Sequence, residues 1–215
     1  LIATSLMAIT VYITSNIFYA GATSANVALF ISSGGSVGTP TFEHTNNFVV
    51  GNGSGTGVSL RGIYTGTGSL FTNNNMAGFA NGATFISANV VGYDCEVSNC
   101  KFHSNSSVGL AAGGTGVSVK KLISCNFHRN GNTGVRLTHA RTYYNSCSFI
   151  GNASHGYTPD PQNNTFGAFT EFNNCTFAGE SSFAQAYGIR SNSAQQLQGV
   201  TVVNSCTFGT GTAHS

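Results

Sequence analysis

Charged side chains are scarce in this chain of 215 residues. Only 7% of the residues are Asp, Glu, Lys or Arg, against about 25% in an average soluble domain. No run of sequence approaches the roughly 20 apolar residues of a membrane-spanning helix, so we expect no membrane insertion. The net charge of +2 forms no basic block, so the chain gives no electrostatic reason to expect nucleic-acid binding.

The N-terminal part lacks charge altogether. None of the first 42 residues is charged, and Glu43 is the first charged side chain. A solvent-exposed stretch of that length would carry several charges, so we expect residues 1–42 to be covered by a partner protein or another domain. Residues 43–215 form the main part of the chain. The apolar content of the whole chain is 40%, with 16 Phe and 8 Tyr, which favours a packed core over disorder.

A block that ends in Cys-x-Phe recurs five times along the chain. A large apolar residue stands three positions before each Cys, and Asn or Ser stands immediately before it. The copies are VSNCKF (97–102), LISCNF (122–127), YNSCSF (144–149), FNNCTF (172–177) and VNSCTF (203–208). A second block follows in three places, as TGVSV (115–119), TGVRL (133–137) and YGIRS (187–191). Upstream, Asn16 takes the place of Cys in ITSNIF.

The spacing of this block predicts strands stacked as a solenoid. Alternate residues of a strand face the same side, so Cys and the Phe two positions later are predicted to point inward. The Asn or Ser before Cys suits a bend, and Asn105, Asn130 and Asn152, three after Phe, suit left-handed turns in a ladder outside the core. One Phe column is predicted from Phe18, Phe48, Phe71, Phe102, Phe127, Phe149, Phe177 and Phe208. The chain is thus predicted to be an all-β, right-handed, single-stranded parallel β-helix of about eight coils.

Five of the six cysteines belong to the repeated block. Their separations of 22 to 31 residues do not match paired zinc ligands, so we expect neither a metal nor a cofactor. Side chains stacked in parallel are poorly oriented for the dihedral angle of a disulfide. We therefore predict a column of buried free thiols that pack as small apolar groups. Cys95 is expected to point inward from the strand before Cys100.

This repeat resembles the parallel β-helix repeat of pectate-lyase-like proteins, phage tailspikes and autotransporter passengers. The resemblance covers most of residues 10–210 and implies a fold that serves lyases, hydrolases, adhesins and spacers alike. The acidic cluster of a calcium-dependent lyase and the polygalacturonase-like motifs are missing. Asp94, Glu96 and Asp160 remain as catalytic candidates, although Asp94 and Glu96 are interpreted first as a solvated strand face. Whether the chain is an enzyme stays open, and the balance favours no activity.

The basic residues are placed more regularly than the acidic ones. Arg136 and Arg190 hold the same outward position in TGVRL and YGIRS, so we expect them on one face about two coils apart. Tyr143 precedes the insert 151–167, which carries His155 and Tyr157. These five residues are predicted to line a groove for an anionic or neutral glycan, because aromatic and planar polar groups suit sugar rings and hydroxyls. The alternative is an ordinary polar surface.

The resemblance implies a structural and receptor-recognition β-helix of a phage tailspike, tail fibre or similar virion appendage that binds host surface polysaccharide. It also implies a homotrimer, an extracellular or virion-associated location, and other virion or surface proteins at the N-terminal end. One alternative is a polysaccharide-degrading enzyme, either a tailspike depolymerase or a secreted lyase or hydrolase. Another is a bacterial surface adhesin or autotransporter passenger.

Overall fold

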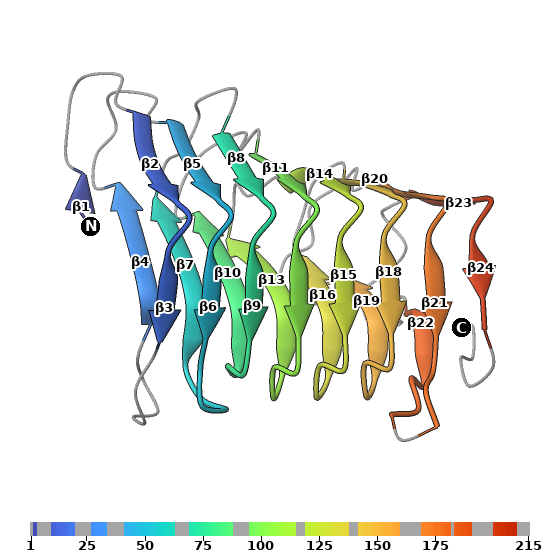
Figure 1. The fold of residues 1–215 in the computed structure, drawn as a ribbon. Helices are drawn as coiled ribbons and strands as arrows, with labels where there is room; N and C mark the ends of the chain where they lie inside the picture. Colours follow the sequence, from blue (N-terminus) through green and yellow to red (C-terminus); the bar gives the residue numbers. More distant parts are fainter. Residues whose placement is uncertain are drawn as a thin grey trace.

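The computed structural model confirms the all-β parallel solenoid (Figure 1). The described part of the chain contains 24 strands and no helix, and hence no helix that could cross a membrane. The structure describes residues 2–3, 10–19, 27–33, 41–62, 69–87, 95–114, 119–137, 142–159, 169–181, 183–190 and 200–209.

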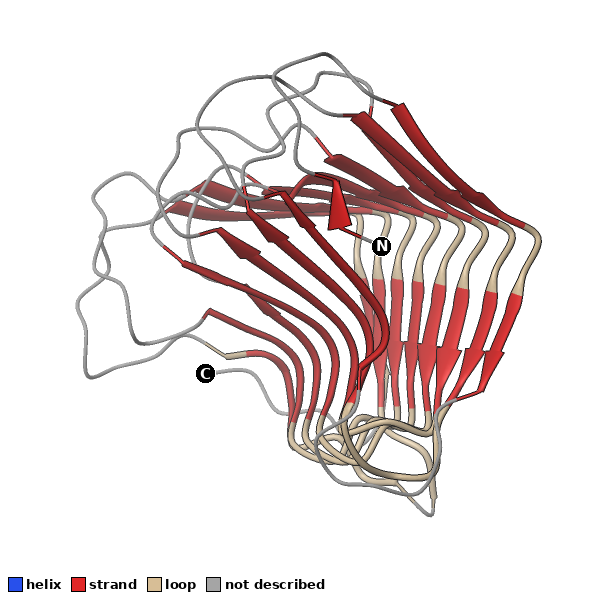
Figure 2. Ribbon diagram, turned by 90° about the vertical axis from the view of Figure 1, so that its left-hand side faces the viewer, coloured by secondary structure: helices blue, strands red, loops and turns tan. Residues whose placement is uncertain are grey.

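The strands form three parallel sheets of eight strands each, which enclose one interior (Figure 2). Sheet A consists of β1 (Ile2–Ala3), β4 (Val27–Ser33), β7 (Thr56–Gly62), β10 (Asn81–Ser87), β13 (Val108–Gly114), β16 (Thr133–Leu137), β19 (His155–Pro159) and β22 (Tyr187–Ile189). Sheet B consists of β2 (Thr10–Thr14), β5 (Thr41–Thr45), β8 (Ser69–Thr72), β11 (Cys95–Ser98), β14 (Val119–Ile123), β17 (Thr142–Asn145), β20 (Phe169–Asn173) and β23 (Val200–Asn204). Sheet C consists of β3 (Ile17–Tyr19), β6 (Phe48–Val50), β9 (Asn75–Ala77), β12 (Lys101–His103), β15 (Asn126–His128), β18 (Ser148–Ile150), β21 (Thr176–Ala178) and β24 (Thr207–Phe208).

The Phe side chains of the Cys-x-Phe block form a continuous inward column in sheet C. The rings of Phe102, Phe127, Phe149, Phe177 and Phe208 stack nearly parallel, with neighbouring centroids 4.7 to 5.1 Å apart. Four of these residues are fully buried, and Phe208 in the last coil is partly buried. A slip of one residue would turn the whole column to solvent, so apolar burial fixes the register of the stack.

Two members predicted for this column were wrong. Val49 and Met76 occupy it, while Phe48 lies in register with Ile17 and Asn75 and points outward. Phe71 belongs instead to the inward column of sheet B, between His44 and Val97. The position in the column depends on the number of residues after the corner. The inward residue stands two positions after the residue that aligns with Cys, which is Asn47 or Asn74 in these coils, and it need not be Phe.

The sequence predicted a bend at the residue before Cys and left-handed turns at the Asn after Phe. In the structure, it is the residue before Cys, at the corner between sheets B and C, that has a left-handed backbone. Its φ lies between 51° and 58° in all eight coils. The residues are Ser15, Asn46, Asn73, Asn99, Ser124, Ser146, Asn174 and Ser205. Ser and Asn suit this position because Asn tolerates left-handed φ and short polar side chains form turns.

Asn and Cys are interchangeable after this corner because each donates a hydrogen bond to the preceding coil. The Nδ2 atoms of Asn47 and Asn74 donate to the carbonyl oxygens of Ile13 and His44, at 2.8 and 2.6 Å. The thiol of Cys125 donates in the same way to the carbonyl oxygen of Val97, at 3.4 Å. Side chains in this column thus hold one coil to the next.

The cysteine column confirms the prediction of free thiols. Cys100, Cys125, Cys147 and Cys175 are buried and Cys206 is partly buried, all without a disulfide. Burial raises the pKa of the Cys125 thiol, so this thiol is not a reactive thiolate. The side chain of Cys95 lies outside the described part.

The Asn residues that follow Phe form a ladder inside the corner between sheets C and A, not outside it as predicted. Asn105, Asn130 and Asn152 are at most 1% exposed. The left-handed residues are those immediately before them, such as Ser104 and Arg129, with φ of 53° and 51°. Inward-facing amides are tolerated because each one bonds the next coil, as described below.

Glycine in the second block is required by close approach of neighbouring coils. A Cβ atom at Gly134 would lie 2.7 Å from the carbonyl oxygen of Gly156 and 3.0 Å from Cβ of Phe127. Gly156 meets the carbonyl oxygen of Gly188 in the same way, at 2.6 Å. In the preceding coil, the glycine that aligns with Gly134 is Gly109 in β13. The sequence had assigned the second block of that coil to TGVSV (115–119) instead. Residues 115–118 of that segment lie outside the described part.

Candidate functional site

The two arginines predicted to share a face do so on the outer face of sheet A. Val135, Tyr157 and Ile189 are in register on β16, β19 and β22. Arg136 follows Val135 and Arg190 follows Ile189, so the two arginines belong to one column and are two coils apart. Both are exposed. Because strands in a sheet are about 4.8 Å apart, the two Cα atoms are separated by roughly 10 Å.

Arg190 belongs to a compact cluster with an imidazole and a phenol. Its Nη1 lies 3.0 Å from Nε2 of His155. The guanidinium lies 5.9 Å from the centroid of the Tyr187 ring, which itself stacks on His155 with centroids 5.5 Å apart. Burial and the positive charge of Arg190 lower the pKa of His155, which keeps the imidazole neutral near pH 7.

Tyr187 was missed by sequence reasoning although a signal for it existed. It is the first residue of the YGIRS block and stands in register with His155. In β22 the residue before the glycine of the block therefore lies beside Arg190 and against His155. Arg190, His155 and Tyr187, with Arg136 two coils away, form what we call the sheet A site.

The remaining two residues of the predicted groove lie elsewhere. Tyr157 points into the core, where its hydroxyl lies 3.4 Å from Oγ1 of Thr170. Gly156 and Tyr157 are both buried, so the strand does not alternate at this point and Tyr157 faces inward. Tyr143 lies on the outer face of sheet B, 38% exposed, with its ring against Phe169.

The described carboxylates do not form the close pair that glycoside hydrolysis uses. Glu96 and Glu171 belong to one outward column of sheet B, but Lys121 and Tyr143 stand between them. Glu171 accepts a hydrogen bond from Asn173 at 2.9 Å. The other two catalytic candidates, residues 94 and 160, lie outside the described part of the chain.

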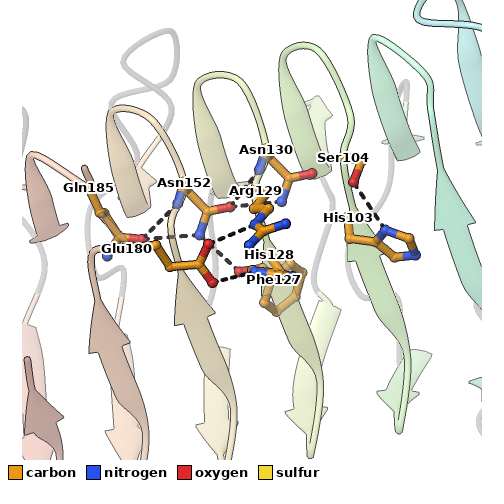
Figure 3. Close-up of polar contacts among 9 residues, drawn as sticks. All are labelled: His103, Ser104, Phe127, His128, Arg129, Asn130, Asn152, Glu180 and Gln185. Atoms are coloured by element: carbon orange, nitrogen blue, oxygen red, sulfur yellow. Dashed lines mark hydrogen bonds and ion pairs between the residues drawn. The ribbon is translucent and has the colours of Figure 1, made fainter. Parts of the chain in front are cut away.

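A second polar cluster lies where sheet C meets the corner to sheet A, and sequence reasoning did not find it (Figure 3). The carboxylate of Glu180 lies 2.6 Å from Nε2 of His128 and accepts a hydrogen bond from Nε of Arg129 at 2.7 Å. The Arg129 guanidinium lies 5.5 Å from the centroid of the Phe183 ring. The hydrogen bond from Arg129 lowers the pKa of Glu180. Glu180 follows β21 outside any repeated block, so no repeat pattern predicts its position.

Within the described ranges, no group of three His, Cys, Asp or Glu side chains is arranged to hold a metal ion.

No family model matches this chain, and no curated protein or solved structure matches it either. A function for the chain therefore has to be proposed from its own residues.

Proposed function

We propose that this chain is the recognition β-helix of a phage tailspike, tail fibre or similar virion appendage, and that it binds host surface polysaccharide. The binding surface is the sheet A site. The observation that carries the proposal is the outward column with Arg136 and Arg190 two coils apart, with His155 and Tyr187 beside Arg190. A polymer lying along the solenoid axis would meet both guanidinium groups at once.

The chemistry of these side chains suits a carbohydrate. Each guanidinium offers five N–H donors in a planar fork, which fits carboxylates and vicinal hydroxyls. The Tyr187 ring supplies an apolar face and a hydroxyl. Arg136, His155 and Tyr187 lie on strands of sheet A, and Arg190 directly follows β22 with its N–H bonded to the carbonyl oxygen of Tyr157. Little backbone order therefore has to be gained on binding.

The N-terminal coils supply a surface for the partners of such an appendage. Tyr12, Ile17 and Tyr19 are 64% to 76% exposed, and Phe48 in the next coil is 40% exposed. The register places Ile17 directly beside Phe48 on the outer face of sheet C. We propose that sister subunits of a homotrimer or other virion proteins cover these side chains in an extracellular, virion-associated assembly. Sedimentation of the protein tests the trimer, and a monomer at micromolar concentration would contradict it.

The polysaccharide proposal is tested with the double variant Arg136→Ala/Arg190→Ala. Binding to a panel of capsular and O-antigen polysaccharides is measured by biolayer interferometry. We expect the variant to lose at least about tenfold in affinity, since each hydrogen bond to a charged group contributes roughly 1.5 to 3 kcal/mol.

Lys121→Ala is the matched control, because it removes one exposed positive charge from sheet B instead. Equal loss in both variants would indicate a general charge effect and contradict the site. Unchanged binding in the double variant would contradict it as well. Reducing ends or unsaturated products in the same incubations would support the alternative of a polysaccharide-degrading enzyme.

A further inference from the structure

Three polar side chains on sheet C are arranged as a nucleophile, a base and an orienting group. Oγ of Ser104 lies 3.3 Å from Nδ1 of His103 (Figure 3), and Nε2 of the same imidazole lies 2.8 Å from Oδ1 of Asn75. When Nε2–H donates to Asn75, Nδ1 carries the lone pair and accepts the hydroxyl proton of Ser104. This relay of hydroxyl, imidazole and oriented acceptor is the arrangement that activates a serine.

Ser104 lies at a corner with a left-handed backbone, which other serines of this chain, such as Ser124 and Ser146, also adopt. The φ of Ser104 is 53°, and the same position is taken by Gly78, Arg129 and Gly151 in neighbouring coils, all at positive φ. Glycine is the unstrained residue there. The side chain of Ser104 is exposed, so its hydroxyl is accessible to a substrate in solvent.

The surroundings of His103 keep it neutral and able to accept a proton. The imidazole is half-buried on the outer face of β12. Burial, and then the charges of His128 and Lys101, lower its pKa. His128 is in turn paired with Glu180. The base is therefore available at neutral pH, which a general base requires.

We propose that Ser104 and His103, positioned by Asn75, form an ester-hydrolysing site for small acyl groups on the outer face of sheet C. Oγ of Ser104 attacks the ester carbonyl carbon while its proton moves to Nδ1 of His103. The ester C–O bond then breaks, and the leaving alcohol takes that proton. Water attacks the acyl-serine with His103 again as base, which releases the carboxylic acid and restores the hydroxyl.

Negative charge on the substrate oxygen needs a positive partner. The N–H groups of Ser104 and Asn105 are already engaged, with the carbonyl oxygen of His128 at 3.0 Å and with Oδ1 of Asn130 at 3.4 Å. Lys101 precedes His103 by two residues and is exposed on the same outer face. Its charge lies near enough to His103 to lower the pKa of that imidazole, and we assign its ammonium group as the positive partner.

This activity is independent of polysaccharide binding by the sheet A site, since it uses a different sheet. The test is labelling with a fluorophosphonate probe, mapped by mass spectrometry, together with hydrolysis of p-nitrophenyl acetate. Labelling is expected on Ser104 and is expected to vanish in Ser104→Gly, which keeps the backbone conformation. His103→Gln is expected to lower kcat/KM by about a hundredfold or more.

Ser146→Gly is the matched control, because Ser146 is an exposed serine with φ of 54° whose hydroxyl bonds only an Asn side chain. It is expected to retain full activity. Labelling of Ser104 no faster than Ser146, or hydrolysis that persists in Ser104→Gly, would overturn the proposal.

Asn75 is tested as a positioning residue. Asn75→Ala is expected to lower kcat about tenfold with KM unchanged, because the imidazole loses the acceptor that fixes its tautomer. Asn75→Asp is expected to restore kcat and to raise the pH midpoint of the rate, since the carboxylate stabilises imidazolium. If both variants changed only thermal stability, this role of Asn75 would be disproved.

Discussion

Asn130 illustrates how one side chain holds neighbouring coils together. Its Oδ1 accepts from Nδ2 of Asn105 at 3.0 Å, and its Nδ2 donates to the carbonyl oxygen of Phe102 at 3.0 Å. In the other direction its Nδ2 and backbone N–H both donate to Oδ1 of Asn152, at 2.8 and 3.2 Å. Because each amide serves two coils, removal of one leaves buried groups without partners on both sides.

We predict that Asn130→Ala lowers the free energy of unfolding by about 2 to 4 kcal/mol, from several unsatisfied buried polar groups. The measurement is chemical denaturation followed by circular dichroism. Asn132→Ala is the control: that side chain is exposed and accepts one hydrogen bond, from Thr133, so a change within about 0.5 kcal/mol is expected. Similar losses in both variants would contradict the ladder.

His44 makes the stability of the first coils depend on pH. The side chain is 0% exposed and stacks on Phe71 with centroids 4.7 Å apart. Burial lowers its pKa from 6.5 to about 4. Folding therefore favours the neutral imidazole, and its contribution is present above pH 6.5 and is lost as the pH falls toward 4.

We predict that His44→Phe removes this part of the pH dependence, because an aromatic side chain fits a column that already contains Phe71. Between pH 7 and 4 the wild-type protein should lose about 3 kcal/mol more stability than the variant. Denaturation curves at a series of pH values measure the difference. Parallel pH profiles for the two proteins would show that His44 is not buried as a neutral imidazole.

At the scale of elements, six of the eight sheet A strands, from β7 to β22, have glycine as their second residue, and this glycine sets how closely those coils stack. We predict that Gly134→Ala destabilises the protein by about 2 kcal/mol or more, because the added methyl group would meet the carbonyl oxygen of Gly156 at 2.7 Å. Thermal unfolding measures this loss, and Asn132→Ala again serves as the neighbouring control. A neutral effect would mean that β16 and β19 are further apart than described.

The strands themselves could be predicted in part from the sequence. The Cys-x-Phe blocks located sheets B and C in the last five coils, because a period of two is unambiguous where Cys and Phe repeat. In an earlier coil Asn47 and Val49 replace that pair. The sequence therefore assigned the inward position to Phe48, one residue before the correct residue, Val49. The internal Asn ladder was not predictable, since a buried amide is tolerated only when the adjacent coil bonds it.

The candidate site, too, could be predicted only in part from the sequence. Arg136 and Arg190 were placed on one face correctly, because each stands two residues after the glycine of its block. Tyr157 was not, because regular alternation fails at Gly156. Glu180 comes from a segment outside the repeat, and its contact with His128 joins residues 52 apart in the chain. Such contacts depend on the stacking of complete coils rather than on any local pattern.

At the scale of the whole molecule, the strands and their side-chain columns run continuously from coil to coil, and the described ends of the chain lie at opposite ends of the stack (Figure 1). Stability in such a stack is nearly a sum of contacts between adjacent coils, so the end coils are the least protected. The exposed Val203 and the partly buried Cys206 and Phe208 mark the C-terminal end. Reactivity of the cysteines should therefore vary with position in the stack.

The most direct test is the alkylation rate of each cysteine in the native protein, measured by mass spectrometry. We predict that Cys100, Cys125, Cys147 and Cys175 are all unmodified thiols, protected until the protein unfolds, whereas Cys206 reacts first. Fast modification of the four buried cysteines, or disulfides between any of them, would contradict the stacked interior.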